Sequence, residues 1–185
     1  MVLYTDFNGD GKQDLVVGSD VGNPAVLLGD GNGGLGTPTA LMLGQGGCGG
    51  VAAGDFDGDG KADVVTVGTS GNTKITFFGG AGNGTFAAAV TTDIPSTTDH
   101  RYAEAVDLDR DGRLDLVFSS MTSSPGVVHV FRNRGGGRFD PVTALSVSNN
   151  PWGLALGDLN GDGKEDLAVV GHLSSKLDIL LSAAQ

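Results

Sequence analysis

The sequence predicts an all-β protein made of four copies of one small sheet. A nine-residue acidic pattern, D-x-[DN]-x-D-G-x-x-D, begins at Asp6, Asp55, Asp107 and Asp158. The copies are therefore spaced by 49, 52 and 51 residues, and a nearly constant period of this size is typical of a repeat architecture. Short apolar runs rich in β-branched residues follow each copy, and no segment has the periodicity of a helix.

The first strand of each unit ends at the acidic pattern. It consists mainly of small and apolar residues, which suits close packing near a central axis. The four segments are VLYT at 2–5, GGVAAGD at 49–55, YAEAVD at 102–107 and WGLALGD at 152–158.

The second strand follows the acidic pattern directly, at 15–17, 64–67, 116–118 and 167–170. Its nearly continuous apolar character predicts burial on both faces, as between stacked sheets. We expect a third strand at 25–28, 74–78, 127–131 and 177–181. A glycine-rich turn then leads to an outer strand at 35–43, 86–94 and 139–147, and the fourth unit ends at Gln185 before any outer strand.

Four-stranded units at this spacing predict the blades of a β-propeller. We expect a single propeller or propeller-fragment domain over 1–185, with repeats at approximately 1–46, 47–97, 98–148 and 149–185. The last repeat lacks its outer strand, which leaves an unpaired edge that favours association. Two interpretations follow: a fragment of a larger propeller, or a homo-oligomer that completes the ring.

The charge of the chain excludes some classes of partner. The formal net charge is −11, so no basic surface is available to bind nucleic acid. Fourteen of the 22 acidic residues stand at recurrent positions of the acidic pattern, so the acidity is local. No run of 18 apolar residues predicts a membrane span, no signal peptide is recognisable, and Cys48 as the only cysteine excludes an internal disulfide.

The acidic pattern has the chemistry of a calcium loop. Side-chain oxygens at positions one, three, five and nine, together with the carbonyl at position seven, can converge on one hard cation. Glycine at position six permits the sharp turn between the early and late ligands. We therefore predict about four Ca²⁺ ions, one per repeat, rather than magnesium or zinc.

The predicted metal ligands fall at the same five positions of each loop. They are Asp6, Asn8, Asp10, Lys12 and Asp14; Asp55, Asp57, Asp59, Lys61 and Asp63; Asp107, Asp109, Asp111, Arg113 and Asp115; and Asp158, Asn160, Asp162, Lys164 and Asp166. The alternative is a set of polar hairpin turns, but turn propensity does not explain carboxylates at fixed offsets against their own repulsion. The apolar residue at position two, Phe7, Phe56, Leu108 or Leu159, is expected to anchor each loop on the core.

The segment GDFDGDGKADVVTVG, followed by a strand and a GNGTF turn, resembles the FG-GAP or VCBS repeat. Such repeats occur in the β-propellers of integrin α-subunits and in many bacterial secreted proteins and lectins. The resemblance covers nearly the whole chain and implies calcium in each hairpin between the first and second strands. It also implies a secreted or cell-surface location. Arg110 departs from the pattern, because the other copies have glycine at position four.

No group of residues predicts catalysis. His100, His129 and His172 are too scattered for a zinc site or a triad, and His129 lies within a predicted strand. Cys48 has no basic neighbour in sequence, so a small buried residue is the favoured interpretation. We expect the chain not to be an enzyme.

A candidate ligand site lies at the opposite end of the first strands. Arg101, Tyr102, Asn150 and Trp152 provide aromatic and polar groups suited to sugars or peptides. Packing of Trp152 between blades is the favoured alternative. The expected function is a calcium-stabilised, non-enzymatic module for extracellular protein or carbohydrate binding or assembly. The alternatives are a lectin with a site near Arg101 and Trp152, and an accessory propeller of a larger secreted enzyme.

Overall fold

The computed structural model of the chain describes residues 1–69, 71–94, 99–121, 125–172 and 175–182. Four separate antiparallel sheets, which we call blades one to four, make up this part of the chain, and it contains no helix. The all-β fold of repeated blades, with a last blade that lacks its outer strand, is confirmed. The sheets do not close into a ring.

Each blade is a meander in which consecutive strands are neighbours. Blade one contains β1 (Val2–Thr5), β2 (Asp14–Val17), β3 (Ala25–Leu27) and β4 (Thr39–Ala40). Blade two contains β5 (Gly47–Gly54), β6 (Asp63–Thr69), β7 (Lys74–Phe78) and β8 (Val90–Asp93). Blade three contains β9 (His100–Val106), β10 (Asp115–Ser120), β11 (Gly126–Asn133) and β12 (Phe139–Val147). Blade four contains β13 (Pro151–Gly157), β14 (Asp166–Gly171) and β15 (Lys176–Leu180).

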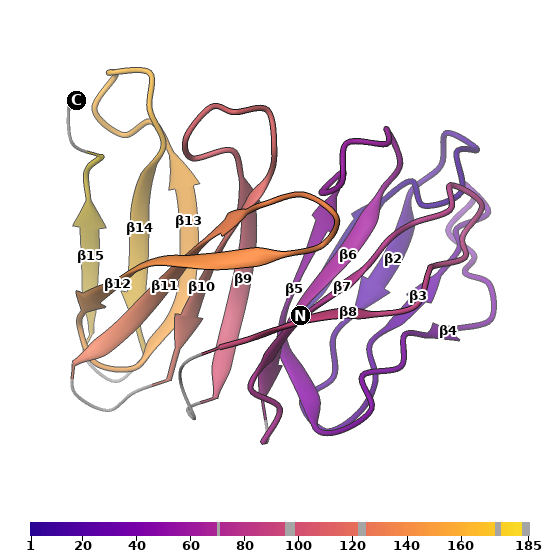
Figure 1. Ribbon diagram of the computed structural model, residues 1–185, viewed down its shortest axis with the longest axis horizontal. Helices are drawn as coiled ribbons and strands as arrows, with labels where there is room; N and C mark the ends of the chain where they lie inside the picture. Colours follow the sequence, from indigo (N-terminus) through magenta and orange to yellow (C-terminus); the bar gives the residue numbers. More distant parts are fainter. Residues whose placement is uncertain (70, 95–98, 122–124, 173–174, 183–185) are drawn as a thin grey trace.

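The blades follow one another across the molecule, with blade four at the left of Figure 1 and blade one at the right. The innermost strands β1, β5, β9 and β13 contact one another in chain order, so the blades share one central side. The acidic loops join each innermost strand to its neighbour, and all of them therefore lie at the same end of the blades. In the part of the chain that the structure describes, no helix could span a membrane.

The outer strands differ most from the sequence prediction. In blades one and two, the segments predicted at 35–43 and 86–94 form an isolated bridge at Leu35 or Phe86 and then the short strands β4 and β8. Pro38 lacks a backbone donor, and the alanines at 87–89 have weak strand propensity, which accounts for the interruption. The outer strand of blade three is continuous, with Pro141 next to an irregularity in the pairing, where proline is tolerated.

The core consists of three apolar clusters, each between two successive blades. Val16 and Phe78 belong to the cluster between blades one and two, Val65 and Phe118 to the next, and Val169 to the last. Strands β6 and β10 are buried along their whole length, as predicted, because a blade lies on each side. The same prediction is wrong for β2 and β14, because each of these strands has a neighbouring blade on one face only.

The apolar side chain at position two of an acidic loop packs against the next blade. Phe7 of the first loop meets Phe86 of blade two, with ring centroids 5.5 Å apart. Phe56 of the second loop meets Phe139 of blade three at 5.9 Å. Both pairs are edge-to-face, a favourable aromatic geometry. The first and second loops therefore each pack against the start of the outer segment of the following blade.

The same anchoring prediction is wrong for the third and fourth loops. Leu108 is 36% exposed and Leu159 is 55% exposed. In blades one and two, the partner of the position-two phenylalanine is the first aromatic residue of the next blade's outer segment. Blade four has no outer strand among the described residues, so it offers Leu108 no such partner. The partner blade, rather than the loop itself, thus determines whether position two is buried.

The two end blades each expose an apolar face. On blade four, Val170 and Leu177 are paired neighbours on the outward face, which also includes Ile179. On blade one, Val2 and Tyr4 of β1 are exposed on the opposite outward face. Between the blades of this chain, faces of the same character are buried in the three core clusters.

We predict that Phe56→Ala lowers the free energy of unfolding by about 3–5 kcal/mol, because it removes a fully buried aromatic side chain. Leu108→Ala, at the same loop position, should cost about 0.5 kcal/mol or less, because blade four has no outer strand among the described residues to cover Leu108. Urea denaturation in saturating calcium measures both values. Equal losses for the two variants would show that contact with the next blade does not stabilise the loops.

Candidate metal centres

The first carboxylate of each acidic loop fixes the loop conformation. Asp55 accepts hydrogen bonds from the N–H groups of Gly58 at 2.7 Å, Asp59 at 3.1 Å and Gly60 at 2.8 Å. Gly58 and Gly60 have φ values of 83° and 82°, a region that favours glycine. Asp6, Asp107 and Asp158 hold the N–H of the position-six glycine in the same way.

The last carboxylate of each loop is buried and joins two hairpins. One oxygen of Asp63 accepts the N–H of Phe56 at 2.8 Å, and the other accepts the N–H of Gly80 at 2.7 Å, just beyond β7. The same pair of bonds recurs in every blade. The other three carboxylates are Asp14, bonded to Phe7 and Gly29; Asp115, bonded to Leu108 and Asn133; and Asp166, bonded to Leu159 and Ser182.

The pKa values of these last carboxylates are shifted in different directions. Burial raises the pKa of Asp63 to about 6 and also raises the pKa of Asp115, both of which lie in blades covered on two sides. In blade four, the N–H of Ser182 lowers the pKa of Asp166. At the first position, the N–H of Gly11 lowers the pKa of Asp6. A nearby cation stabilises the charged form of a buried carboxylate whose pKa is raised, because it offsets the cost of burying the charge.

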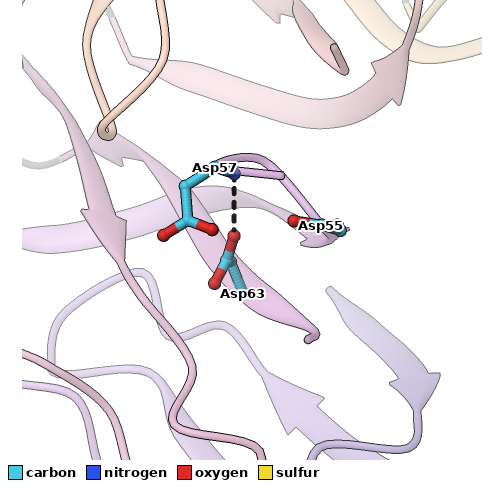
Figure 2. A group of neighbouring side chains, drawn as sticks. All are labelled: Asp55, Asp57 and Asp63. Atoms are coloured by element: carbon cyan, nitrogen blue, oxygen red, sulfur yellow. Dashed lines mark hydrogen bonds between the residues drawn. The ribbon is translucent and has the colours of Figure 1, made fainter. Parts of the chain in front are cut away.

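Three carboxylates converge in the second loop and again in the third. Figure 2 shows Asp57 and Asp63 pointing toward each other, with Asp55 beside them. Ligand oxygens from these three residues lie within 4.8 Å of one another, as do those of Asp107, Asp109 and Asp115. The N–H of Asp57 also donates to Asp63 at 3.3 Å. Carboxylate oxygens grouped at this spacing suit a hard cation such as calcium.

The first and fourth loops have asparagine at position three, which supplies a neutral amide oxygen in place of a carboxylate. The side-chain oxygen of Asn8 accepts the N–H of Asp10 at 3.0 Å, and Asn160 accepts the N–H of Asp162 at 2.8 Å. Asp57 makes the equivalent contact with Asp59 at 3.1 Å. The first and fourth loops therefore have the same conformation as the second, although each carries one negative charge fewer.

The carboxylate at position five faces the residue at position seven. Asp59 accepts the N–H of Lys61 at 2.9 Å and its ammonium group at 2.8 Å, and this side-chain contact lowers the pKa of Asp59. The N–H contact recurs in the other loops, from Lys12 to Asp10, Arg113 to Asp111 and Lys164 to Asp162. That position five and the carbonyl at position seven also bind the metal remains a prediction.

Arg110 keeps the geometry that glycine has at position four of the other loops. Its φ value is 60°, in the left-handed region, beside values of 74°, 83° and 81° for Gly9, Gly58 and Gly161. Its guanidinium group bonds the carbonyl of Gly163 in the fourth loop. Arginine in place of glycine therefore keeps the backbone conformation of the third loop and adds a hydrogen bond to the fourth loop.

The family model of the FG-GAP-like repeat matches this chain three times, at residues 6–66, 65–118 and 117–169. The chain belongs to the FG-GAP-like repeat family. FG-GAP repeats are generally calcium-binding, and this chain has acidic clusters that could hold a metal ion. A search of curated proteins finds no match.

Among solved structures, this FG-GAP-like chain is similar to BBS1N, which was crystallised in complex with ARL6DN and soaked with lead. The TM-score is 0.60 and the sequence identity is 15%. The match covers 100% of this chain and 57% of that chain, so this chain spans little more than half of its structural neighbour. At this identity the likeness concerns the fold, and together with the repeats it supports the arrangement of the sheets as propeller blades.

The candidate ligand residues gather at the end of the blades opposite the acidic loops. Arg101 is the centre of the group: its guanidinium carbon lies 5.9 Å from the centroid of the Trp152 ring, and Nη1 lies 2.5 Å from Asp20 of blade one. Trp152 packs against His172 at 4.7 Å and is still 39% exposed. Trp152 of blade four thus contacts Arg101 of blade three. This contact favours the alternative in which Trp152 packs between blades.

Irregular backbone presents the other aromatic and polar residues of this group. The strand pairing shifts at Tyr102 and at Trp152, so each interrupts the ladder of its blade, as in a β-bulge. Tyr102 and Asn150 have φ values of 35° and 51°, and the carbonyl of Asn150 accepts the N–H of His172 at 2.8 Å. Sequence reasoning did not place His172 in this group, because it stands just after the second strand of blade four and gives no signal in the first-strand alignment.

The other two histidines and Cys48 are buried in the core. His100 and His129 pack against Phe118, and burial lowers the pKa of both histidines, to about 4 for His129. Nδ1–H of His100 donates to the carbonyl of Gly68 at 2.8 Å. Cys48 is buried, as predicted, and burial raises the pKa of its thiol.

We predict that Asp63→Ala in excess chelator lowers the free energy of unfolding by about 2–4 kcal/mol, because the N–H groups of Phe56 and Gly80 lose their acceptor. Asp59→Ala should cost much less, because Asp59 and its partner Lys61 are exposed. Chemical denaturation of both variants separates the structural role of the carboxylates from metal binding. Similar small losses in both would contradict the structural role of Asp63.

Proposed function

We propose that this chain is a calcium-stabilised, non-enzymatic propeller module that serves extracellular binding or assembly. The observation that supports the proposal best is the convergence of Asp55, Asp57 and Asp63 in a loop already shaped by its own N–H groups. Bound calcium would offset the repulsion of these carboxylates and cross-link the first two strands of the blade. The position-one and position-nine carboxylates would hold it, with position three completing the set.

The same chemistry argues for a structural rather than a catalytic metal. The position-nine carboxylate has both oxygens bonded to backbone N–H groups of its own blade, so an ion there would reinforce these hairpins. The three histidines and Cys48 lie away from the acidic loops, two of the histidines in the core and His172 at the opposite end. A secreted or cell-surface location suits such an ion, because extracellular calcium modules bind with dissociation constants of roughly 10⁻⁴ to 10⁻³ M.

Calcium should therefore raise the melting temperature. Ion at 100 times its dissociation constant stabilises the folded state by about 2.7 kcal/mol per site, and several such sites rival the total stability of a domain. Differential scanning calorimetry in saturating calcium and in excess chelator makes the comparison, with magnesium at equal concentration as the control. An unchanged melting curve in chelator would refute the calcium proposal.

The exposed faces of the end blades support a role in assembly. Val170, Leu177 and Ile179 of blade four have the apolar character of faces that are buried between blades of this chain, as have Val2 and Tyr4 of blade one. Because these faces lie at opposite ends of the molecule, a second copy can cover them head to tail. We propose a homo-oligomer that continues the blades in this way.

Light scattering should accordingly give the mass of a dimer or a higher oligomer. Ile179→Asp should lower that mass to a monomer, because it places a charge in the interface. Tyr102→Asp, at a partly exposed position of blade three and therefore away from both end faces, serves as the control and should leave the mass unchanged. A monomeric parent chain would contradict this assembly.

A second candidate function is that of a lectin. The exposed indole of Trp152 favours it, because an open aromatic face beside the polar group of Arg101 can stack on a sugar ring. Trp152 is the only tryptophan, so sugar binding should change the fluorescence of the protein directly. Screening on a glycan array, followed by fluorescence titrations of the parent chain and of Arg101→Ala, which keeps the indole and should weaken the response, tests this candidate. An array without hits would argue against it.

A further inference from the structure

A positively charged side chain lies beside the third acidic loop, and the second loop has no counterpart to it. Nε of Arg132 lies 2.7 Å from a carboxylate oxygen of Asp109. Asp109 stands at position three and is one of the three carboxylates that converge in this loop. Both side chains are partly buried, with 36% and 26% exposure, so their attraction is less screened than that of a surface pair.

The position of Arg132 can be matched in the other blades through one recurrent hydrogen bond. Arg132 precedes Asn133, whose N–H donates to the position-nine carboxylate Asp115. The residues that donate the same bond elsewhere are Gly29, Gly80 and Ser182, so the matching positions are Leu28, Gly79 and Leu181. None of these three residues carries a charge. An arginine at this position is thus particular to blade three.

Blade two shows that this position faces the metal loop. A Cβ atom built on Gly79 would lie 3.8 Å from a carboxylate oxygen of Asp57, the position-three residue of the second loop. A side chain at the matching place in blade three is therefore directed to Asp109 by the backbone itself. The contact between Arg132 and Asp109 follows from the geometry of the blade as well as from charge.

Two further arginines add positive charge around the third loop. Arg113 pairs with Asp111, and Arg110 reaches the carbonyl of Gly163 in the fourth loop. A cavity of about 860 Å³ lies between these two loops, and Arg132 and Arg110 line it together with Asp109. The second loop has only Lys61 in its sequence as a basic residue. The carboxylates of the third loop are thus largely compensated within the chain.

We infer that Arg132 is an internal counter-ion that makes the third loop a much weaker calcium site than the second. An ion entering this loop must displace the guanidinium group from Asp109 or stand close to its positive charge. This inference rests on the proposed function, because it grades the affinity of loops that are proposed to bind calcium. Arg132 thereby allows the third loop to keep its shape at calcium levels that leave it without an ion.

A site-resolved calcium titration tests the inference. Gly11, Gly60, Gly112 and Gly163 stand at position six of the four loops, and each N–H donates to the position-one carboxylate, so each amide resonance reports on its own loop. We expect the Gly112 resonance to shift at a calcium concentration about tenfold or more above that for Gly60. In Arg132→Leu, which introduces the residue of blades one and four, the Gly112 midpoint should fall by about tenfold.

Matched variants separate a local effect from net charge. Arg134→Leu removes the same charge two residues away, but Arg134 pairs with Asp140 outside the loop, so the Gly112 midpoint should not change. Arg132→Gln removes the charge with less change of shape and should act like Arg132→Leu. The reciprocal Gly79→Arg should raise the Gly60 midpoint, which keeps the inference testable if Arg132→Leu fails to fold.

Three results would overturn the inference. Equal midpoints for Gly60 and Gly112 in the parent chain would show that Arg132 does not weaken the third loop. Equal effects of Arg132→Leu and Arg134→Leu would assign the difference to net charge. A titration in which no glycine responds would refute calcium binding itself, whereas a response of Gly60 equal to that of Gly112 refutes only the role of Arg132.

Discussion

The buried carboxylate at position nine of each acidic loop is the contact on which the blade depends. In blade two, Asp63 joins the loop at Phe56 to the end of the third strand at Gly80, so one side chain ties two hairpins together. A buried charge is costly unless it is hydrogen-bonded, and the raised pKa of Asp63 reflects that cost. A cation placed beside this carboxylate would therefore stabilise the folded chain. Calcium binding and blade architecture share the same residue.

The loops also determine how one blade meets the next. Because position two projects into the following blade, Phe7 and Phe56 link the metal corner of one blade to the outer segment of its neighbour. The carbonyl of Phe56 additionally accepts a hydrogen bond from the side chain of Asn133, at 2.7 Å. These contacts each join a loop to the following blade, as expected of repeat proteins in which each unit contacts its neighbours. Where the next outer segment is lacking, Leu108 is exposed.

Most of the fold could be predicted from the sequence, because period and strand pattern are local properties. The acidic pattern places the loops, and the apolar runs place the first three strands of each blade to within a few residues, whereas the outer strands of blades one and two are shorter than predicted. The sequence could not reveal the hydrogen-bond partners of position nine. Gly29, Gly80, Asn133 and Ser182 are of three residue types and stand after hairpins of different length, so the repeat pattern does not identify them as equivalent.

Contacts between blades were equally hidden in the sequence. The contacts of Arg101 with Asp20 and Trp152 join blade three to blades one and four. The ion pair of Arg132 with Asp109 lies within blade three, but it too joins residues that are far apart in the chain. Position within a repeat predicts a residue's place in its own blade, but the neighbouring blade determines its exposure and its partners. Leu108 and Leu159 illustrate this limit, since the same loop position is buried in blades one and two.

The central claim is that the acidic loops are metal sites held ready by their own backbone. An anomalous difference map from crystals grown in calcium tests it most directly. The account predicts a peak bounded by the carboxylates of Asp55, Asp57 and Asp63, and a weaker peak or none in the third loop. Calcium-grown crystals with no peak in the second loop would contradict the account.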